Sequence, residues 1–146
     1  MATRTARTAW KGTLMEGSGR VELTSSEAGS YDVTFPKRTA DDADGTTSPE
    51  ELIAAAHSSC YAMQLSGLIA KAGGTPGSLD VRADVTVHPD PAGGLRITGV
   101  KLTVRGRDVI GLDPEGFAEV ANKAKDTCPV SKALTGTEIT LDAALA

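Results

Sequence analysis

Residues 48–74 decide the fold, and they read SPEELIAAAHSSCYAMQLSGLIAKAGG. Serine at the N-cap, proline at the first helical position and glutamate three residues after the cap form a capping box, which predicts that a helix begins here. Helix-forming residues continue to Ala72, and Gly73-Gly74 predicts the end. Because apolar residues occur around most of its circumference, we expect this helix to be buried on nearly all sides, inside the domain or across a subunit contact. A homodimer is the simpler expectation for a chain this short.

The segments on both sides of this helix alternate between polar and apolar residues, which predicts strands. Upstream we expect strands over residues 6–14, 19–24 and 30–35, then a polar, acidic loop over residues 38–47. Downstream we expect a hairpin, a helix capped by Asp113, a short helix that begins at Cys128-Pro129, and a closing strand, over residues 79–88, 95–104, 113–125, 127–131 and 137–144. The order βββ-α-ββ-α-α-β is typical of an α+β fold with a largely antiparallel sheet and helices on one face.

Length and composition restrict the function classes. The 146 residues contain no linker or repeat, so we expect a single domain over residues 1–146. Aromatic residues make up 3% and the net charge is -4, which argues against binding to nucleic acid or to anionic lipid. The apolar runs are too short to cross a bilayer, and no apolar signal segment follows the N-terminus. We therefore expect a soluble, cytoplasmic protein without membrane attachment.

The chain contains two cysteines, Cys60 and Cys128, and two histidines, His57 and His88. This set lacks the close Cys/His spacing of a structural zinc site, and no Gly-rich phosphate-binding pattern occurs, so we expect neither a metal nor another cofactor. The two cysteines could be inert buried thiols, a catalytic nucleophile or a redox couple.

The surroundings of each cysteine leave these options open. Cys60 lies in the middle of the apolar helix, so it needs a nearby cation or donor to become reactive, and the candidates are Arg38, Arg20 and His57. His57 could be a base for Cys60, or a core residue bonded to a backbone carbonyl. Cys128 is expected at an N-cap, where free N–H groups favour a thiolate, but it could also fill a corner as a small apolar residue.

Residues 47–61, TSPEELIAAAHSSCY, and residues 123–131, KAKDTCPVS, together resemble the OsmC/Ohr family of thiol peroxidases. The similarity covers essentially the whole chain, and the histidine and the CPVS sequence look more like the OsmC branch than the Ohr branch. The resemblance implies an intertwined homodimer in which a mostly antiparallel sheet wraps around the long helix. It also implies reduction of hydroperoxides without metal or flavin, organic ones in preference to hydrogen peroxide, in defence against oxidative or osmotic stress.

The resemblance further implies roles for individual residues. Cys60 matches the cysteine that attacks the peroxide, and Cys128 matches the resolving cysteine, which converts the Cys60 sulfenic acid into a disulfide. Glu50 matches the glutamate that positions a catalytic arginine. The pattern favours Arg38, as in the OsmC branch, over Arg20, which would match the Ohr branch. An external dithiol of the dihydrolipoyl or thioredoxin type would reduce the disulfide.

Helix geometry adds an expectation about this site. In an unbroken helix, Glu50 and Cys60 are about 15 Å apart along the axis, so one arginine can hardly touch both. Either the helix breaks between them, or Arg38 and Glu50 reach Cys60 from the opposite subunit. Glu51 is placed for the capping box, and we assign it a structural role.

Two other functions are compatible with the residues. The first is a cysteine hydrolase that uses Cys60 and His57 as nucleophile and base. The second is a non-enzymatic dimer that binds an apolar ligand in an interface cavity, with both thiols inert.

Overall fold

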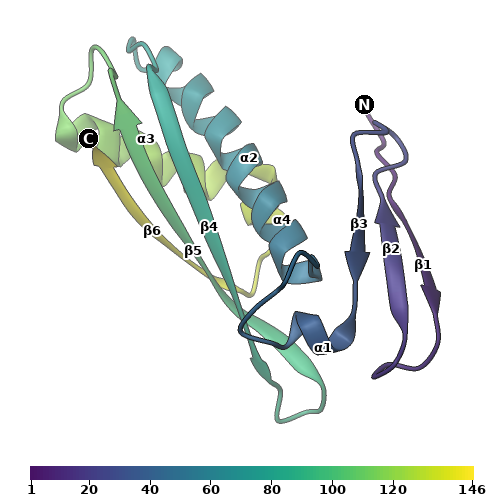
Figure 1. Ribbon diagram of the computed structural model, residues 1–146. Coiled ribbons are helices and arrows are strands. Elements are labelled where there is room, and N and C mark those ends of the chain that lie inside the picture. The colour runs from purple at the N-terminus through teal and green to yellow at the C-terminus, as the bar shows by residue number, and fades with distance from the viewer. The chain divides into compact units, whose positions relative to one another are not determined.

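The computed structural model describes all 146 residues and divides into two compact units, Met1–Leu52 and Ile53–Ala146. Helix α2 (Pro49–Lys71) begins in the first unit and continues without a break into the second (Figure 1). None of the helices combines the length and apolar character that a membrane span requires. The single domain over residues 1–146 stays a prediction.

The first unit contains a three-stranded antiparallel sheet in the order β1-β2-β3. Its strands are β1 (Arg7–Lys11), β2 (Ser18–Glu22) and β3 (Ser30–Val33). The predicted first hairpin is therefore present, although β1 ends before residue 14. Gly12 turns the chain after β1 with a φ of +96°, a conformation that favours glycine.

A short helix, α1 (Phe35–Arg38), replaces the end of the predicted third strand and the start of the predicted loop. The strand ends at Val33 because the Thr34 side chain caps α1, accepting a hydrogen bond from the Lys37 N–H at 3.3 Å. Pro36 lies in the first turn, where its missing N–H leaves no helical bond unmade. As a result, Arg38 lies on a helical turn rather than in a loop.

The second unit contains a sheet in the order β4-β5-β6. Strands β4 (Ser78–Pro89) and β5 (Leu95–Arg107) form the predicted antiparallel hairpin. Strand β6 (Glu138–Leu145) pairs parallel to β5, with Val100 opposite Ile139. Parallel pairing is possible because the chain crosses over through α3 (Pro114–Thr127) and α4 (Pro129–Ala133) before it returns. The α+β class and the largely antiparallel pairing are confirmed; the parallel exceptions are the β5–β6 pair and an isolated bridge between Val33 and Thr47.

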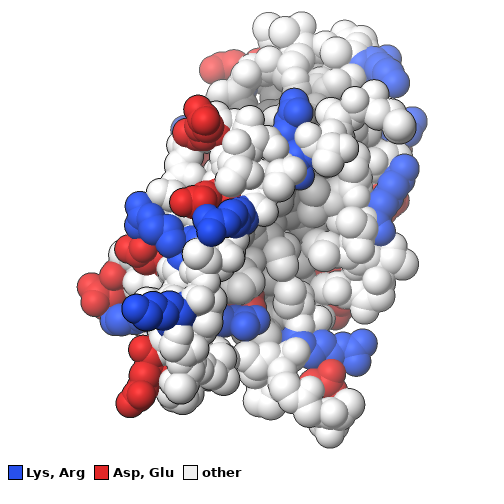
Figure 2. Space-filling model, turned by 90° about the vertical axis from the view of Figure 1, so that its right-hand side faces the viewer, with Lys and Arg blue, Asp and Glu red and all other residues white.

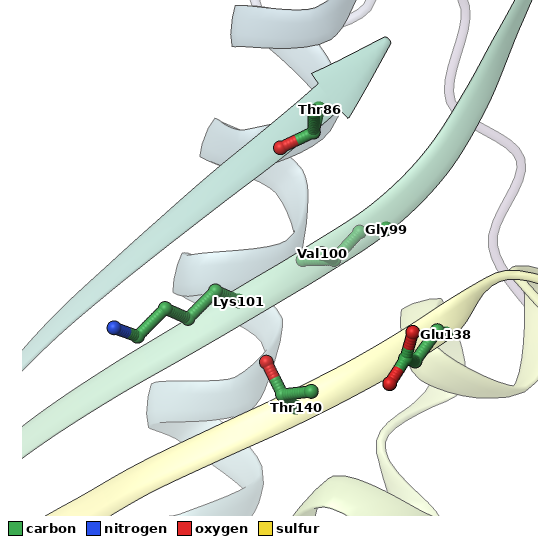
Figure 3. A pocket seen from close by; sticks show the side chains of 6 residues that line it. All are labelled: Thr86, Gly99, Val100, Lys101, Glu138 and Thr140. Atoms are coloured by element: carbon green, nitrogen blue, oxygen red, sulfur yellow. The ribbon is translucent and has the colours of Figure 1, made fainter. Parts of the chain in front are cut away.

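The core of the second unit lies between this sheet and the helices, which cover one face of it (Figure 1). Its fully buried members come from α2, from every second residue of β5 and from α3 with the following N-cap: Tyr61, Leu65, Ile69, Val100, Leu102, Val104, Phe117, Ala121, Ala124 and Cys128. The opposite face of the sheet is polar. There Thr86, Lys101, Glu138 and Thr140 line a shallow depression of about 170 Å³ (Figure 3).

Within one chain, α2 is buried along one stripe and not around its whole circumference. His57, Tyr61, Leu65 and Ile69 are fully buried, whereas Met63 is 73% exposed. Burial on nearly all sides is therefore not seen within one chain, and burial across a subunit contact stays a prediction. On the face shown in Figure 2, basic and acidic side chains are interspersed, and neither sign forms a continuous field.

Candidate active site

The two cysteines lie next to each other although 68 positions separate them in the sequence. Cys60 lies in the middle of α2, and Cys128 is the residue between α3 and α4. The Cys128 thiol donates to the Cys60 sulfur, with the two Sγ atoms 3.3 Å apart, and both thiols are free. Cys128 is fully buried, and Cys60 is half-buried. A disulfide bond of about 2.05 Å needs only a short approach from this position.

The surroundings of Cys60 within one chain keep it a thiol. Burial raises the pKa of Cys60, and the neighbouring Cys128 raises it further. The backbone N–H of Val130, in the first turn of α4, donates to the Cys60 sulfur and lowers the pKa, but only partly offsets the burial. Cys128 does occupy the predicted N-cap, with Pro129 in the first turn of α4. The N–H of Val130 in this helix nevertheless donates to the sulfur of Cys60, and the Cys128 side chain makes no capping hydrogen bond.

His57 is fully buried and bonded to a side chain rather than to a backbone carbonyl. Its Nε2 lies 2.7 Å from the Ser131 Oγ, and its buried Nδ1 has no hydrogen-bond partner. Burial lowers the pKa of His57, which favours the neutral imidazole. No hydrogen bond joins His57 to Cys60, so the nucleophile–base pair that a cysteine hydrolase requires is not formed.

Arg38 and Glu50 form the most extensive ion pair of the first unit. The Arg38 Nη2 lies 2.6 Å from the Glu50 Oε1, and the Arg38 Nε lies 3.1 Å from both carboxylate oxygens. The hydrogen bond with Glu50 raises the pKa of Arg38. Burial alone would raise the pKa of Glu50, but the hydrogen bonds from Arg38, the backbone and Ser48, together with the charge of Arg38, outweigh it and lower that pKa. Arg20, the other candidate arginine, binds Asp32 at 2.7 Å.

Glu51 differs from its neighbour in its contacts. The Ser48 hydroxyl accepts a hydrogen bond from the Glu51 N–H at 3.1 Å, as the capping box predicts. The Glu51 carboxylate accepts instead from the Thr47 hydroxyl, one residue before the cap. Glu51 therefore stabilises the start of α2, while Glu50 holds a guanidinium.

An apolar groove of about 380 Å³ in the first unit has Arg38 among its lining residues. Its walls come from the strands, from α1 and from the first turn of α2: Thr8, Trp10, Leu14, Val21, Val33, Thr34, Phe35, Arg38, Pro49 and Leu52. The sequence analysis did not anticipate this groove. The available signal was the single tryptophan, Trp10, which is 43% exposed on β1.

Three further polar residues surround the sulfurs and were not singled out from the sequence. They are Ser131, the partner of His57, and the pair Gln64 and Thr127, in which the Gln64 Nε2 donates to the Thr127 Oγ1 at 2.9 Å. No spacing in the sequence indicates Ser131, because it lies 74 positions from His57 on a different helix. No group of three or more His, Cys, Asp or Glu side chains is arranged to hold a metal ion.

Similarity to known proteins extends over nearly the whole chain. The chain is 39% identical over 133 residues to peroxiredoxin OsmC of Escherichia coli strain K12, covering 91% of this chain and 90% of that protein. It is 33% identical over 107 residues to the organic hydroperoxide resistance protein OhrB of Bacillus subtilis strain 168, covering 73% and 74%. The higher identity to OsmC agrees with the expected branch.

The fold and the family signature agree with these identities. The crystal structure of an organic hydroperoxide resistance protein from Elizabethkingia anophelis superposes with a TM-score of 0.77 at 25% identity, covering 100% of this chain and 98% of that one. The sequence profile described as OsmC-like protein matches residues 41–143, which include both cysteines. The chain therefore belongs to the OsmC-like family, the OsmC/Ohr family that its two cysteine motifs resemble.

Proposed function

We propose that this chain is a homodimeric, cysteine-based peroxidase that reduces organic hydroperoxides. The observation that carries the proposal is the 3.3 Å separation of the Cys60 and Cys128 sulfurs, both free, in an otherwise apolar core. Two thiols so close can alternate between dithiol and disulfide with little movement. The names of the relatives, peroxiredoxin and organic hydroperoxide resistance protein, support the reaction class.

The first step is attack of the Cys60 thiolate on the outer oxygen of the hydroperoxide. The O–O bond breaks, a sulfenic acid forms on Cys60, and the alkoxide leaves and takes a proton to become the alcohol. The thiolate and the departing alkoxide both need a fixed positive group, because burial raises the pKa of Cys60. Arg38 supplies this charge in the proposal, and Glu50 holds its guanidinium in place.

The second step is resolution of the sulfenic acid by Cys128. The Cys128 sulfur attacks the Cys60 sulfur, a disulfide forms, and the hydroxyl leaves as water with the thiol proton. An external dithiol then reduces the disulfide by exchange and leaves as its own disulfide. We place this dithiol in the dihydrolipoyl or thioredoxin class, and the enzyme in the cytoplasm, where it would act in oxidative or osmotic stress defence.

The proposed site takes Arg38 and Glu50 from the opposite subunit. Helix α2 is unbroken from Pro49 to Lys71, so Glu50 and Cys60 are about 15 Å apart along its axis. A guanidinium bound to Glu50 at 2.6 Å can hardly contact the sulfur of the same helix. A partner chain also accounts for the exposed side of α2, which one chain does not cover.

The apolar groove beside Arg38 supports an organic substrate. Its walls are largely apolar apart from Arg38 and two threonines, so an alkyl or aryl group would bury apolar surface there, with the peroxide toward Arg38 in the proposal. The same groove also favours one alternative, a non-enzymatic dimer that binds an apolar ligand and leaves both thiols inert.

Titration of the reduced protein with cumene hydroperoxide separates these functions. We expect one equivalent of hydroperoxide to remove two free thiols per chain and to yield one equivalent of alcohol, and dithiothreitol to restore both thiols. A peroxidase then turns over repeatedly when hydroperoxide and dithiothreitol are both in excess. If both thiols survive a tenfold excess of hydroperoxide, the chain is a ligand-binding protein and the peroxidase proposal is wrong.

A further inference from the structure

Three side-chain contacts in a row join α2 to the corner where α3 ends and α4 begins. His57 contacts Ser131 at 2.7 Å, the two sulfurs lie 3.3 Å apart, and Gln64 contacts Thr127 at 2.9 Å. The sulfur pair thus has a polar contact on each side of it along α2. We call the His57–Ser131 and Gln64–Thr127 contacts the two clasps.

Both clasps end on side chains that are themselves held in place. The Thr127 hydroxyl donates its proton to the Lys123 carbonyl at 2.7 Å, so its oxygen is oriented to accept from Gln64. Ser131 is buried on α4, three residues after the resolving cysteine. The clasps therefore connect α2 to the two helical ends that flank Cys128.

The first clasp requires a buried polar ring in an otherwise apolar position. His57 is fully buried, and its Nδ1 has no hydrogen-bond partner there. The loss of hydration at this nitrogen is therefore not compensated and destabilises the folded state. An apolar side chain would fill the same place without that cost. The contact between Nε2 and Ser131 is the only polar interaction that the ring makes, so it is the property that distinguishes histidine from an apolar residue here.

Disulfide formation depends on how often the two sulfurs meet. From 3.3 Å they must approach by about 1.3 Å to form a bond of about 2.05 Å. A corner that moves freely away from α2 lowers the effective concentration of one thiol near the other. A corner held on both sides keeps that concentration high.

We propose that the two clasps are positioning contacts that hold the α3–α4 corner on α2 and thereby favour the Cys60–Cys128 disulfide. The proposal assigns no substrate contact to the four residues of the clasps. They affect only the distance between the Cys60 and Cys128 sulfurs, and they are His57, Ser131, Gln64 and Thr127. The inference rests on one part of the proposed function, namely that Cys60 and Cys128 form a disulfide.

The equilibrium with dithiothreitol tests the clasps without any peroxide. In this exchange the two thiols lose two electrons and two protons, and the cyclic disulfide of oxidised dithiothreitol gains them and becomes the dithiol. Wild type, Ser131→Ala, Gln64→Leu and the double variant are equilibrated at a series of oxidised-to-reduced dithiothreitol ratios. The samples are quenched with acid and alkylated, and free thiols are counted by mass spectrometry.

We expect each single variant to lower the equilibrium constant for disulfide formation by about threefold to tenfold, because the disulfide keeps the corner on α2 and so holds each contact more firmly than the dithiol does. The double variant should lower it further than either single variant. Ser59→Ala is the matched control, because the Ser59 hydroxyl bonds only to carbonyls of its own helix, at 2.8 Å and 3.1 Å. Thr127→Ser keeps the hydroxyl, so its equilibrium constant should stay close to that of wild type. Thr127→Val removes the hydroxyl and should lower the constant.

A merely structural role gives a different result. It would lower the unfolding temperature equally in the dithiol and disulfide forms, and the equilibrium constant would not change. The clasp proposal is overturned if the equilibrium constants of the single and double variants all lie within twofold of the wild-type value. If wild type itself forms no disulfide at any ratio, the resolving step of the proposed function fails instead, so the two failures are distinguishable.

Discussion

The sulfur pair and the Arg38–Glu50 ion pair create opposite electrostatic conditions. Cys128 lies in an apolar core and Cys60 packs against it, and burial raises the pKa of Cys60 and opposes the reactive thiolate. Arg38 and Glu50 are charged groups held by three short contacts, which keep the pKa of Arg38 raised and that of Glu50 lowered. One region holds sulfur without a cation, and the other holds a cation without sulfur.

This difference explains why the proposed reaction needs both regions. A thiolate in an apolar core needs a positive partner, and a guanidinium bound to a carboxylate has no nucleophile to activate. Helix α2 carries Glu50 in its first turn and Cys60 ten residues later. The same helix therefore contributes to both regions and keeps Glu50 and Cys60 apart along its axis. Each of the following variants removes one of these two parts and leaves the other intact.

Cys60→Ser should have the largest effect. The serine hydroxyl cannot replace a thiolate as a peroxide nucleophile, so we expect dithiothreitol-dependent reduction of cumene hydroperoxide to fall by at least about a thousandfold. Ser59→Ala, on the adjacent residue of α2, should keep the wild-type rate. Residual activity above a tenth of wild type would assign the attack to another group.

Arg38→Met should have the next largest effect. It removes the positive group while leaving both sulfurs in place, and we expect kcat/KM for cumene hydroperoxide to fall by about a hundredfold to a thousandfold. Arg20→Met removes an arginine that binds Asp32 and Ser30, and its kcat/KM should stay within a few-fold of wild type. The reverse ranking would move the catalytic role to Arg20.

Mixed dimers of these two variants decide which subunit supplies Arg38. If the guanidinium acts across the interface, a dimer of one Cys60→Ser chain and one Arg38→Met chain contains one site with both residues intact. We then expect about half of the wild-type activity in the purified mixed dimer. If the guanidinium acts within its own chain, both sites are defective, and the mixed dimer stays as inactive as its parents.

Cys128→Ser should separate the first turnover from the following ones. Cys60 and Arg38 remain, so the burst of alcohol in the first turnover should keep its rate. Resolution fails, and we expect Cys60 to accumulate sulfinic acid, detected by mass spectrometry, while sustained turnover falls by about tenfold or more. A cysteine hydrolase would be indifferent to this change, so unaltered sustained turnover would contradict the resolving role.

The parts of this comparison that could be predicted from the sequence are those with local signals. The start of α2 follows from the Ser48 cap and the proline after it, and its end from Gly73, so the helix was predicted almost to its observed bounds, Pro49–Lys71. The Asp113 cap of α3 was predicted correctly for the same reason, since its side chain accepts from the Gly116 N–H at 2.8 Å. The cysteine motifs indicated the family, but the family resemblance, and not the spacing, assigned their roles.

The parts that could not be predicted depend on contacts between distant residues. The parallel pairing of β6 with β5 requires knowledge of where the chain crosses over, and alternation in residues 137–144 is the same for parallel and antiparallel strands. The partner of His57 lies 74 positions away, at Ser131, so no helical period reveals it. The apolar groove combines side chains from three strands and two helices, and no single segment carries its pattern.

Glu50→Gln should have the smallest effect on catalysis and a distinct dependence on pH. Arg38 keeps its charge but loses its partner, so we expect about a tenfold fall in kcat/KM and a loss of about 1–2 kcal/mol in the free energy of unfolding near neutral pH. The folded state lowers the pKa of Glu50, so this stabilisation is complete above the unfolded-state pKa of about 4.3. It is lost as the pH falls through the lower folded-state pKa.

Urea unfolding of wild type and Glu50→Gln from neutral pH down to about pH 3 measures this dependence, and the two curves should converge in acid. Glu51→Gln is the matched control, because the neighbouring carboxylate lies in the same helical turn but accepts from the Thr47 hydroxyl and meets no guanidinium. It shares the favourable position at the helix N-terminus, so any loss common to both variants reports the helix dipole. If the difference in free energy of unfolding between wild type and Glu50→Gln stays constant down to about pH 3, packing and not charge holds Arg38. The contrast between the two regions would then not be electrostatic.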